Sequence, residues 1–398
     1  MRVIVIGAGI GGLAAGLMLR RAGIEVDIFE QASELREIGA GIQISPNASI
    51  ILQRLGLTDQ MREFGVRPLA VQIRKWDDGR VLTRQPLAEY CERNFGAPYY
   101  HFHRADLLDI LSNALPRSVL HLNHRCIDVR CYRERAEVTF QDRTVVDADV
   151  IIGADGIHSI IHELLLGPVS ARFSGHVAYR GLVRSERIAD LGLELCASSW
   201  WGPGRHFVQY FVGAGARWVN WVAVVPGEWR VESWTERGEV ADALREFGAW
   251  HPQVRSIIGA VELTNRWALY DRDPLPRWTT GRVTLLGDAA HAMLPYMAQG
   301  AAQSIEDAAV LARCLERYSG DVETALCRYE QVRKPRTTVC QEGSRRNGSM
   351  YHLADGEEQQ SRDANLSAAM TAPLPQNAWL YGHDAELEIE RLKPSSGD

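Results

Sequence analysis

Three glycines and a carboxylate near the N-terminus have the types and spacing that bind a dinucleotide. Gly7, Gly9 and Gly12 fit the pattern GxGxxG, in which glycines allow a tight turn and let the backbone approach a pyrophosphate closely. Glu30, with Gln31 beside it, stands where a carboxylate accepts hydrogen bonds from a ribose 2′-hydroxyl. An acid at that position disfavours a 2′-phosphate, so the pattern predicts FAD or NAD rather than NADP.

The elements expected around these residues form a βαβ unit. Residues 3–6 predict a buried strand, residues 13–21 a helix and residues 24–29 a second strand that ends next to Glu30. The N-terminus of the helix would offer free N–H groups and the positive end of its dipole to the phosphates. A GxGxxG pattern alone also fits a tight turn in an unrelated α/β fold, but the order of strand, turn, helix, strand and acid favours dinucleotide binding.

Two further segments place an aspartate after an expected buried strand. Asp155 lies in the segment GADG (residues 153–156), and Asp288 follows a strand predicted over residues 283–286. Asp288 could meet a second ribose or a polyol, whereas the GADG segment alone fits a plain acidic turn about equally well. The N-terminus of a helix expected near Gly300 could stabilise an anion.

Composition excludes several other classes of protein. The chain has 398 residues, 46% hydrophobic and 24% charged, which is typical of a globular protein with a sizeable core. The net charge of −6 gives no reason to expect nucleic acid or an anionic membrane as a partner, and no apolar run is long enough to predict a membrane span. The seven cysteines are scattered without metal-ligand spacing, which predicts no metal site and favours the reducing cytoplasm.

In this order and spacing, the three motifs resemble the single-component (group A) FAD-dependent aromatic hydroxylases, which include para-hydroxybenzoate hydroxylase. The segment HRADL (residues 103–107) is similar to the family's Arg-x-Asp-Leu segment, and the resemblance extends over nearly the whole chain. His162 departs from the family, which usually has an arginine at that place. The resemblance implies contacts with FAD at Gly7, Gly9, Gly12, Glu30, Gln31, Arg104, Cys126, Asp155, Asp288, Gly300 and Ala301.

The resemblance also implies the fold class, an α/β fold of the para-hydroxybenzoate hydroxylase type. A GxGxxG βαβ domain that binds FAD is interrupted by a mixed or antiparallel substrate-binding sheet, and C-terminal helices cover the molecule. The expected domains are the discontinuous FAD-binding domain (1–70, 96–170 and 265–340), the substrate-binding domain (71–95 and 171–264) and a helical C-terminal tail (341–398).

Within this family the chain looks most like the salicylate hydroxylase branch, which includes 3-hydroxybenzoate 6-hydroxylase and 6-hydroxynicotinate 3-monooxygenase. The similar segments are residues 37–43 (EIGAGIQ), 178–181 (AYRG), 205–210 (RHFVQY) and 379–382 (WLYG).

Four residues bear on the choice of substrate within that branch. Gln43 and Tyr296 stand where the 6-hydroxynicotinate enzymes have histidines, and Gln43 fits the salicylate and 3-hydroxybenzoate enzymes better. Pro295 stands where the 3-hydroxybenzoate enzymes have a glutamine, which disfavours 3-hydroxybenzoate as the substrate. Arg180 is a candidate contact for a carboxylate or for the cofactor.

His206 and Tyr210 are the candidate catalytic pair. They stand four positions apart in an expected strand, so both would lie on one face and could line one pocket. Histidine, with an unperturbed pKa of about 6.5, suits a general base that takes the proton of a phenol, or it could only position the ring. Tyr210 could hydrogen-bond the carboxylate or hydroxyl of the substrate. The sequence alone favours a structural role, in which His206 is a hydrogen-bonded core histidine and Tyr210 packs beside it. The similar family segment reverses that preference and favours a functional role.

The activity implied by the resemblance is hydroxylation of a phenolic aromatic acid with NADH (or NADPH) and O2, through a flavin C4a-hydroperoxide. A salicylate-type substrate, which would lose CO2 and become a catechol, is favoured over 3-hydroxybenzoate and 6-hydroxynicotinate. A flavin oxidase or dehydrogenase, or a non-catalytic FAD-binding protein, could use the same scaffold. The family is often dimeric, so we expect a homodimer with a small aromatic acid as substrate and without nucleic acid or membrane as partner.

Overall fold

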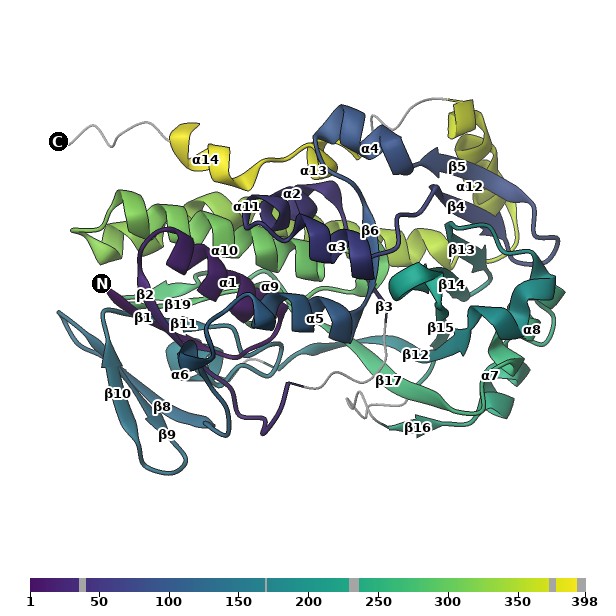
Figure 1. Cartoon of the computed structure of the whole chain (residues 1–398). Helices are drawn as coiled ribbons and strands as arrows, with labels where there is room; N and C mark the ends of the chain where they lie inside the picture. Colours follow the sequence, from purple (N-terminus) through teal and green to yellow (C-terminus); the bar gives the residue numbers. More distant parts are fainter. Residues whose placement is uncertain (36–40, 169, 229–235, 372–376, 392–398) are drawn as a thin grey trace.

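The computed structural model describes residues 1–35, 41–168, 170–228, 236–371 and 377–391. Its elements form two regions, the six-stranded region and the eight-stranded region, each named after its largest sheet, and one long helix runs along both (Figure 1).

The six-stranded sheet is mostly parallel. Its strands in spatial order are β18 (Thr279–Thr280), β19 (Val283–Leu285), β11 (Val150–Gly153), β1 (Arg2–Ile6), β2 (Glu25–Phe29) and β7 (Leu120–His121). All neighbours pair in parallel except β18 and β19. Parallel strands rich in valine and isoleucine are stable when both faces are covered, and Val3, Ile4 and Val5 are completely buried.

Helices cover this sheet, and two smaller sheets adjoin it. The helices are α1 (Ile10–Arg21), α2 (Pro46–Arg54), α3 (Thr58–Phe64), α5 (Arg104–Asn113), α6 (Ile160–Leu166), α9 (Asp288–His291), α10 (Gly300–Arg317) and α14 (Ala385–Arg391). A three-stranded antiparallel sheet of β8 (Cys126–Cys131), β9 (Ala136–Phe140) and β10 (Val145–Ala148) lies at the lower left of Figure 1. The other small sheet is the antiparallel pair of β3 (Gly41–Ile44) and β6 (Tyr100–His103).

The eight-stranded sheet is antiparallel except between β13 and β4. Its strands in spatial order are β16 (Arg237–Gly238), β17 (Thr264–Asp271), β12 (Arg172–Arg184), β15 (Trp218–Pro226), β14 (Arg205–Val212), β13 (Ala197–Gly202), β4 (Ala70–Lys75) and β5 (Val81–Pro86). One face packs against α7 (Val240–Glu246) and α8 (Pro252–Gly259) through a core that includes Trp200, Phe207 and Trp221. The opposite face is turned toward the six-stranded region, where Tyr296 packs against Val224.

The long helix α11 (Val322–Tyr351) connects the two regions and is followed by short helices (Figure 1). These are α12 (Glu357–Ala368) and α13 (Ala378–Tyr381), and α4 (Ala88–Phe95) packs near α13. The 3₁₀ helices are η1 (Arg117–Val119), η2 (Ser185–Leu191), η3 (Ala214–Ala216), η4 (Pro295–Met297) and η5 (Ala369–Thr371).

Two of the expected domain boundaries fall inside elements of the structure. β17 begins at Thr264 and pairs with β12, so residues 265–271 belong to the eight-stranded sheet rather than to the FAD-binding domain. α11 continues from Val322 to Tyr351, so the chain does not change domain at residue 341. Strand pairing and helix continuity decide both boundaries, and neither leaves a sharp signal in composition.

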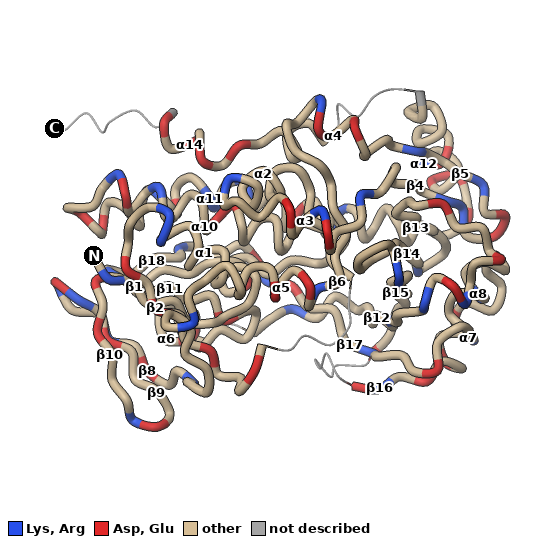
Figure 2. Tube along the Cα trace, in the orientation of Figure 1, with Lys and Arg blue, Asp and Glu red and all other residues tan. Residues whose placement is uncertain are grey.

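The surface has no simple charge asymmetry. Figure 2 shows acidic and basic residues interspersed over both regions. Of the helices in the described part of the chain, none combines the length and the apolar character that crossing a membrane requires.

Candidate active site

The turn between β1 and α1 needs glycine at two positions because of close backbone packing. Gly7 has φ +107°, and a Cβ there would lie 2.4 Å from the carbonyl oxygen of Ala154. A Cβ on Gly12 would lie 1.9 Å from the carbonyl oxygen of Gly7. Both distances are impossible for a real side chain, so these glycines bring the turn, the helix and β11 together.

Gly9 differs, because nothing lies within 4 Å of where its Cβ would be. It is the N-cap of α1, and it has no side-chain capping hydrogen bond. The first turn of α1 also carries no acidic side chain. Open space in front of an uncapped helix N-terminus fits a pyrophosphate, whose oxygens would accept the free N–H groups.

Glu30 holds this turn from the end of β2. Its Oε2 accepts the N–H of Ala8 at 2.8 Å, and its Oε1 accepts the N–H of Ala32 at 2.9 Å. A carboxylate has about four acceptor sites, so it can receive ribose hydroxyls as well. Gln31 is exposed next to it. The expected cofactor contacts at the N-terminus therefore lie together.

A second group of expected cofactor residues lies at the N-terminus of α10. Asp288 begins α9 and is exposed, and its Oδ1 would be 3.8 Å from a Cβ on Gly300. Gly300 and Ala301 begin α10, which has no acidic residue in its first turn and no side-chain cap on Gln299. A polyol beside Asp288 and an electron-rich ring edge at these N–H groups suit this arrangement.

A buried ionic network, which sequence reasoning missed, positions Asp288. Asp307 Oδ2 accepts the N–H of Gly287 at 3.0 Å and contacts His291 Nε2 at 2.6 Å, while its Oδ1 accepts from Arg333 Nε at 2.7 Å. Glu306 accepts from Arg333 and Arg336. Burial disfavours the charged form of Asp307, but His291 and Arg333 outweigh it and lower the pKa of Asp307 to about 2.

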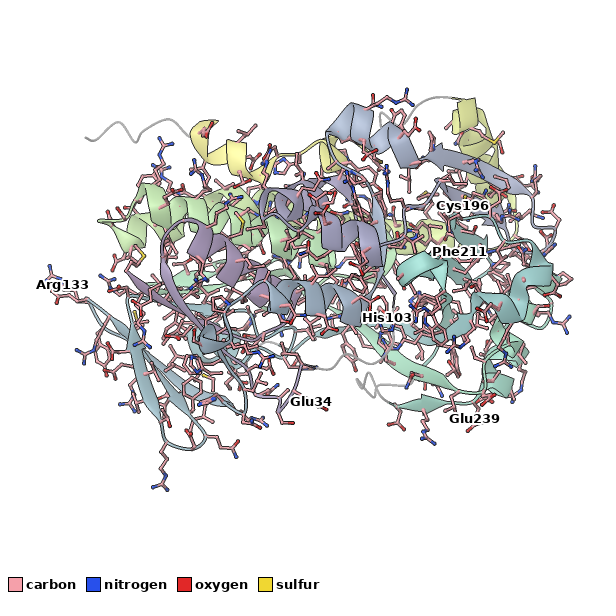
Figure 3. The ribbon with its side chains drawn as sticks, in the orientation of Figure 1. Glu34, His103, Arg133, Cys196, Phe211 and Glu239 are labelled. Carbon is pink, nitrogen blue, oxygen red and sulfur yellow. The ribbon has the colours of Figure 1, made fainter. Side chains whose placement is uncertain are left out.

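Three other expected cofactor residues lie on separate elements. Arg104 is the first residue of α5, directly after His103, which Figure 3 places where the two regions meet. Cys126 begins β8, and burial raises the pKa of its thiol to about 12. Asp155 accepts from Ser159 Oγ at 2.5 Å and from the N–H of Ile160 at 2.8 Å. Its carboxylate therefore caps α6 in this structure.

The face of the eight-stranded sheet that is turned toward the six-stranded region has one row of partly exposed residues. Ser199 of β13, Val208 of β14 and Val222 of β15 are direct neighbours across three strands, and each is partly exposed. Arg180 of β12 continues the row next to Val222, is buried, and lies over the ring of Trp267 at 4.9 Å. We call Ser199, Val208 and Val222 the open row.

His206 flanks the open row on one side, two residues before Val208 on β14, in a cluster of aromatic rings. Its Nδ1 lies 2.6 Å from Nε2 of His352, which follows the last residue of α11. The rings of Tyr296 and Tyr351 lie 5.2 and 5.4 Å from its ring. Burial, together with His352 and His176, holds the pKa of His206 well below its usual range, so the ring is neutral.

Tyr210 flanks the open row on the other side, two residues after Val208 on β14. Its ring lies 4.7 Å from that of His101, and a Cβ on Gly41 would lie 2.7 Å from its hydroxyl. Asn220 accepts the N–H of Gly41 at 2.7 Å, and Gln43 accepts from the hydroxyl of Tyr99 at 2.7 Å. His206 and Tyr210 thus share a face, as expected, but their immediate neighbours differ. Of the similar segment 37–43, residues 37–40 lie outside the described residues.

The remaining substrate residues lie in η4. Tyr296 is buried against His206, and its hydroxyl has no hydrogen-bond partner among the described residues. Burial raises the pKa of Tyr296 above its usual range. Pro295 is exposed. Since η4 ends at Met297, shortly before Gly300, this segment links the open row to the N-terminus of α10.

Sequence reasoning missed Tyr351, His352, His101 and Asn220. His101 and Asn220 each have a buried nitrogen without a partner among the described residues, which is typical of a site that receives a polar ligand. No local motif marks these four residues. Tyr351 and His352 reach His206 only because α11 is long enough to end at β14. His101 and Asn220 are both linked to β3, which pairs with His101 at Gln43 and bonds Asn220 at Gly41.

Comparison with known proteins identifies the group that this site belongs to. Residues 1–343 match a family described as FAD binding domain. A 3-amino-4-hydroxybenzoate 2-monooxygenase of Streptomyces cremeus is 40% identical over 389 residues, which is 97% of this chain and 96% of the relative. A 6-hydroxynicotinate 3-monooxygenase of Pseudomonas fluorescens is 39% identical over 352 residues, 87% of this chain and 91% of the relative.

Solved structures agree over the whole fold. A salicylate hydroxylase substrate complex matches with a TM-score of 0.85 and 28% identity, covering 100% of this chain and 99% of its own. HpxO of Klebsiella pneumoniae, complexed with FAD and uric acid, matches with a TM-score of 0.83 and 29% identity, covering 92% of this chain and 93% of its own.

These matches confirm the predicted fold class and the cofactor. FAD fits the open space at Gly9 and the N-terminus of α10, and the monooxygenase reaction also uses O2 and a nicotinamide nucleotide as reductant. Both relatives named above are monooxygenases, which favours that reaction over a flavin oxidase, a dehydrogenase or a non-catalytic FAD-binding protein. The chain belongs to the FAD-dependent monooxygenases that act on aromatic rings.

Proposed function

We propose that this monooxygenase hydroxylates a small aromatic acid that carries a phenolic hydroxyl and lies on the open row of Ser199, Val208 and Val222. The observation that carries this proposal is the partial exposure of these three neighbours in the middle of a face that is otherwise largely buried. Polar groups stand on both sides of the row, and η4 connects it to the N-terminus of α10. A ring placed there would be close to the flavin and shielded from water.

The chain's own residues bind and orient the ring, while bound FAD supplies the reducing equivalents and the activation of O2. His206 contacts the phenolic hydroxyl on one side of the row. Tyr210 and Asn220 hydrogen-bond a polar substituent on the other side, where Nδ2 of Asn220 lacks a partner among the described residues. Arg180, beside Val222, supplies positive charge for the carboxylate.

The first substrate to test is 3-amino-4-hydroxybenzoate. The relative from Streptomyces cremeus that carries this activity is similar over almost the full length of both chains. Its name places the new oxygen at ring position 2, next to the carbon that bears the amino group. An amino group donates electrons to the neighbouring ring carbon without losing a proton, which agrees with a neutral His206 that orients the ring by hydrogen bonding.

A salicylate-type substrate, which the sequence alone favoured over the other rings, is the second candidate. The salicylate hydroxylase complex aligns with the entire chain, and Gln43 suits that branch. The reaction would be decarboxylative hydroxylation to a catechol. This reaction requires the phenol to lose or share its proton while oxygen is transferred. His206, as the acceptor of that proton, therefore matters more for salicylate than for an aminophenol.

The test is oxidation of NADH by the FAD-loaded protein, with O2 uptake and product analysis. 3-Amino-4-hydroxybenzoate, salicylate, 3-hydroxybenzoate and 6-hydroxynicotinate are supplied in parallel, and NADPH replaces NADH in a second series. We expect one of the four compounds to stimulate NADH oxidation and to yield one hydroxylated product, in an amount equal to the NADH oxidised. CO2 release marks the salicylate type. If all four rings give only peroxide or no stimulation, the proposed substrate class is wrong, while the family assignment stands.

A further inference from the structure

The hydroxyl of Ser199 makes one hydrogen bond, and that bond limits what else the hydroxyl can do. Ser199 is the end of the open row on β13, and its Oγ accepts the indole N–H of Trp201 at 2.7 Å. A serine hydroxyl can also donate its own proton. Ser199 donates to none of the described residues, and it is partly exposed. Its O–H group is therefore available to a molecule that lies on the open row.

Trp201 is held in place by two further groups. It stands two residues after Ser199 on the same face of β13 and is only 2% exposed. Its ring stacks on that of Tyr351, with centroids 4.2 Å apart, and the guanidinium of Arg362 lies 5.3 Å from the centroid of the indole ring. A cation beside the ring draws electrons from the indole, so the indole N–H becomes a stronger donor. Because hydrogen bonds in a chain polarise one another, Ser199 in turn becomes a stronger donor.

Ser199 and His206 lie diagonally across neighbouring strands. In the register of β13 and β14, Ser199 pairs with Val208 and Trp201 pairs with His206. Diagonal neighbours on one face of a sheet have Cα atoms about 7–8 Å apart. The side chains of Ser199 and His206 can therefore contact the same substituent of a ring that lies on the open row. The phenolic hydroxyl that we assign to His206 is thus within reach of Ser199.

We propose that Ser199 is a second residue that contacts the phenolic oxygen of the substrate, and that its donated hydrogen bond makes this corner of the open row select a hydroxyl group over an amino group. The inference rests on the proposed function for the position of the ring. Ser199 keeps its proton throughout, so its role is recognition and the stabilisation of negative charge on the phenolic oxygen.

The chemistry of the two substituents explains the selection. An aromatic hydroxyl both donates and accepts, so it can satisfy Ser199 and His206 together. The lone pair of an aromatic amino group is delocalised into the ring, which makes this group a poor acceptor and would leave the Ser199 proton unpaired. On a ring that carries both groups, such as 3-amino-4-hydroxybenzoate, the hydroxyl therefore lies at Ser199 and the amino group lies elsewhere.

Other polar groups near this corner are already paired or are buried. Arg362 forms an ion pair with Asp363 at 2.7 Å, and the hydroxyl of Tyr351 donates to the carbonyl oxygen of Tyr296 at 2.7 Å. The hydroxyl of Tyr296 lies in the same cluster, but it is buried, whereas Ser199 is partly exposed on the open row. Ser199 is therefore the donor that a ring on the open row would meet beside His206.

The test compares compounds in which a hydroxyl group is replaced by an amino group. The two pairs are 3-amino-4-hydroxybenzoate with 3,4-diaminobenzoate, and salicylate with 2-aminobenzoate. Binding to the FAD-loaded protein is measured from the change in flavin absorbance. We expect the wild type to bind the hydroxyl compound of at least one pair about 10-fold more tightly than its amino counterpart. Ser199→Ala should reduce this preference to about 3-fold or less, and Ser199→Thr, which keeps the hydroxyl, should retain it.

Ser198→Ala is the matched control, because Ser198 precedes Ser199 on β13 and lies on the opposite face, paired with Gln209. It should leave the preference unchanged. Trp201→Phe keeps an aromatic ring against Tyr351 but removes the N–H, so it should reduce the preference less than Ser199→Ala does. An unchanged preference in Ser199→Ala would overturn the inference. A loss of affinity that is equal for both compounds of a pair would mark a structural role and would overturn it as well.

A second measurement needs no substrate and separates failure of this inference from failure of the proposed function. NMR of the indole N–H groups in the FAD-loaded protein reports on Trp201, whose signal is identified by its absence in Trp201→Phe. We expect Ser199→Ala to shift this signal and Ser198→Ala to leave it in place. An unshifted signal in Ser199→Ala would refute the inference even if one ring is hydroxylated. If the signal shifts but the wild type binds neither compound of either pair, the proposed substrate class is wrong, and the role of Ser199 in recognising it is wrong too.

Discussion

The six-stranded region and the eight-stranded region hold their functional groups by different kinds of contact. At Gly7 and Gly12 the backbone is packed so closely that no side chain fits, and the groups that we propose for FAD are mostly N–H groups at helix ends. On the eight-stranded sheet the groups that we propose for the substrate are side chains: His206, Tyr210 and Asn220, all buried. The cofactor site thus depends on backbone shape, and the substrate site depends on residue identity.

This difference explains how one fold accepts many aromatic rings. A backbone cradle can bind the same cofactor while side chains elsewhere change, because its shape depends on the glycines and helix ends that form it. The open row changes with each substitution at Ser199, Val208 or Val222, without disturbing the buried opposite face. The two regions can therefore change independently, except where a shared element joins them.

The largest effect is expected for Gly12→Ala, which tests the backbone half of the comparison. Its Cβ would overlap the carbonyl oxygen of Gly7, so the turn cannot close and the protein should retain no FAD. Gly9→Ala is the matched control, since its Cβ meets only open space: the apoprotein should unfold at nearly the wild-type urea concentration, yet bind FAD more weakly. Flavin absorbance and fluorescence titration measure both. A Gly12→Ala protein that binds FAD normally would refute the steric account.

Arg333→Met should cost about 3–5 kcal/mol of unfolding free energy, because it leaves Glu306 and Asp307 buried without their shared partner. FAD affinity should fall as well, since Asp307 holds the loop that carries Asp288. Arg313→Met removes a surface partner of Glu316 and should change stability by less than about 1 kcal/mol. Urea unfolding of the apoproteins gives the comparison, and equal midpoints for the two variants would disprove the role of the network.

His206→Ala tests the side-chain half. It should retain FAD at wild-type affinity and lose most substrate-stimulated turnover, by a factor on the order of 100 or more. Steady-state NADH oxidation with product analysis measures the loss, and flavin absorbance measures retention. Full activity in this variant would remove His206 from the mechanism.

The buried ionic network should lose its contribution to stability in acid. Asp307 and Glu306 have pKa values of about 2 in the folded protein, below the values of about 3.9 and 4.3 in an unfolded chain. Their contribution to stability is therefore complete above about pH 4–5 and is lost as pH falls toward 2. Urea midpoints between pH 6 and 2 should drop in the wild type and drop less in Asp307→Asn. An equally steep decline in Asp307→Asn would contradict this assignment.

The smallest effect is expected for Glu30→Ala. It removes the acceptor of the Ala8 N–H and the proposed ribose contact, so the dissociation constant of FAD should rise about 10-fold. Fluorescence titration measures it, and Gln31→Ala, an exposed neighbour, serves as the control. Unchanged affinity in Glu30→Ala would mean that the carboxylate supports the turn only.

Local motifs predicted the cofactor half well, and long-range contacts limited prediction of the other half. The expected strands and helix around Gly7–Gly12 are present as β1, α1 and β2. They could be predicted because hydrophobic periodicity and the positions of the glycines are local signals, contained within about thirty residues. The shared face of His206 and Tyr210 also followed from strand geometry. Their partners did not, since His352 and His101 are brought in by helix length and strand pairing, which leave no local signal.

One helix ties the two independent halves together. α11 has thirty residues and spans about 45 Å, with Arg333 in the ionic network under the cofactor loop and Tyr351 at the end that meets His206. A chimera that takes only residues 172–271 from a relative would set the new strand β14 against the old Tyr351 and His352. Exchange of substrate preference between members of this family should therefore succeed when the last turn of α11 travels with the sheet.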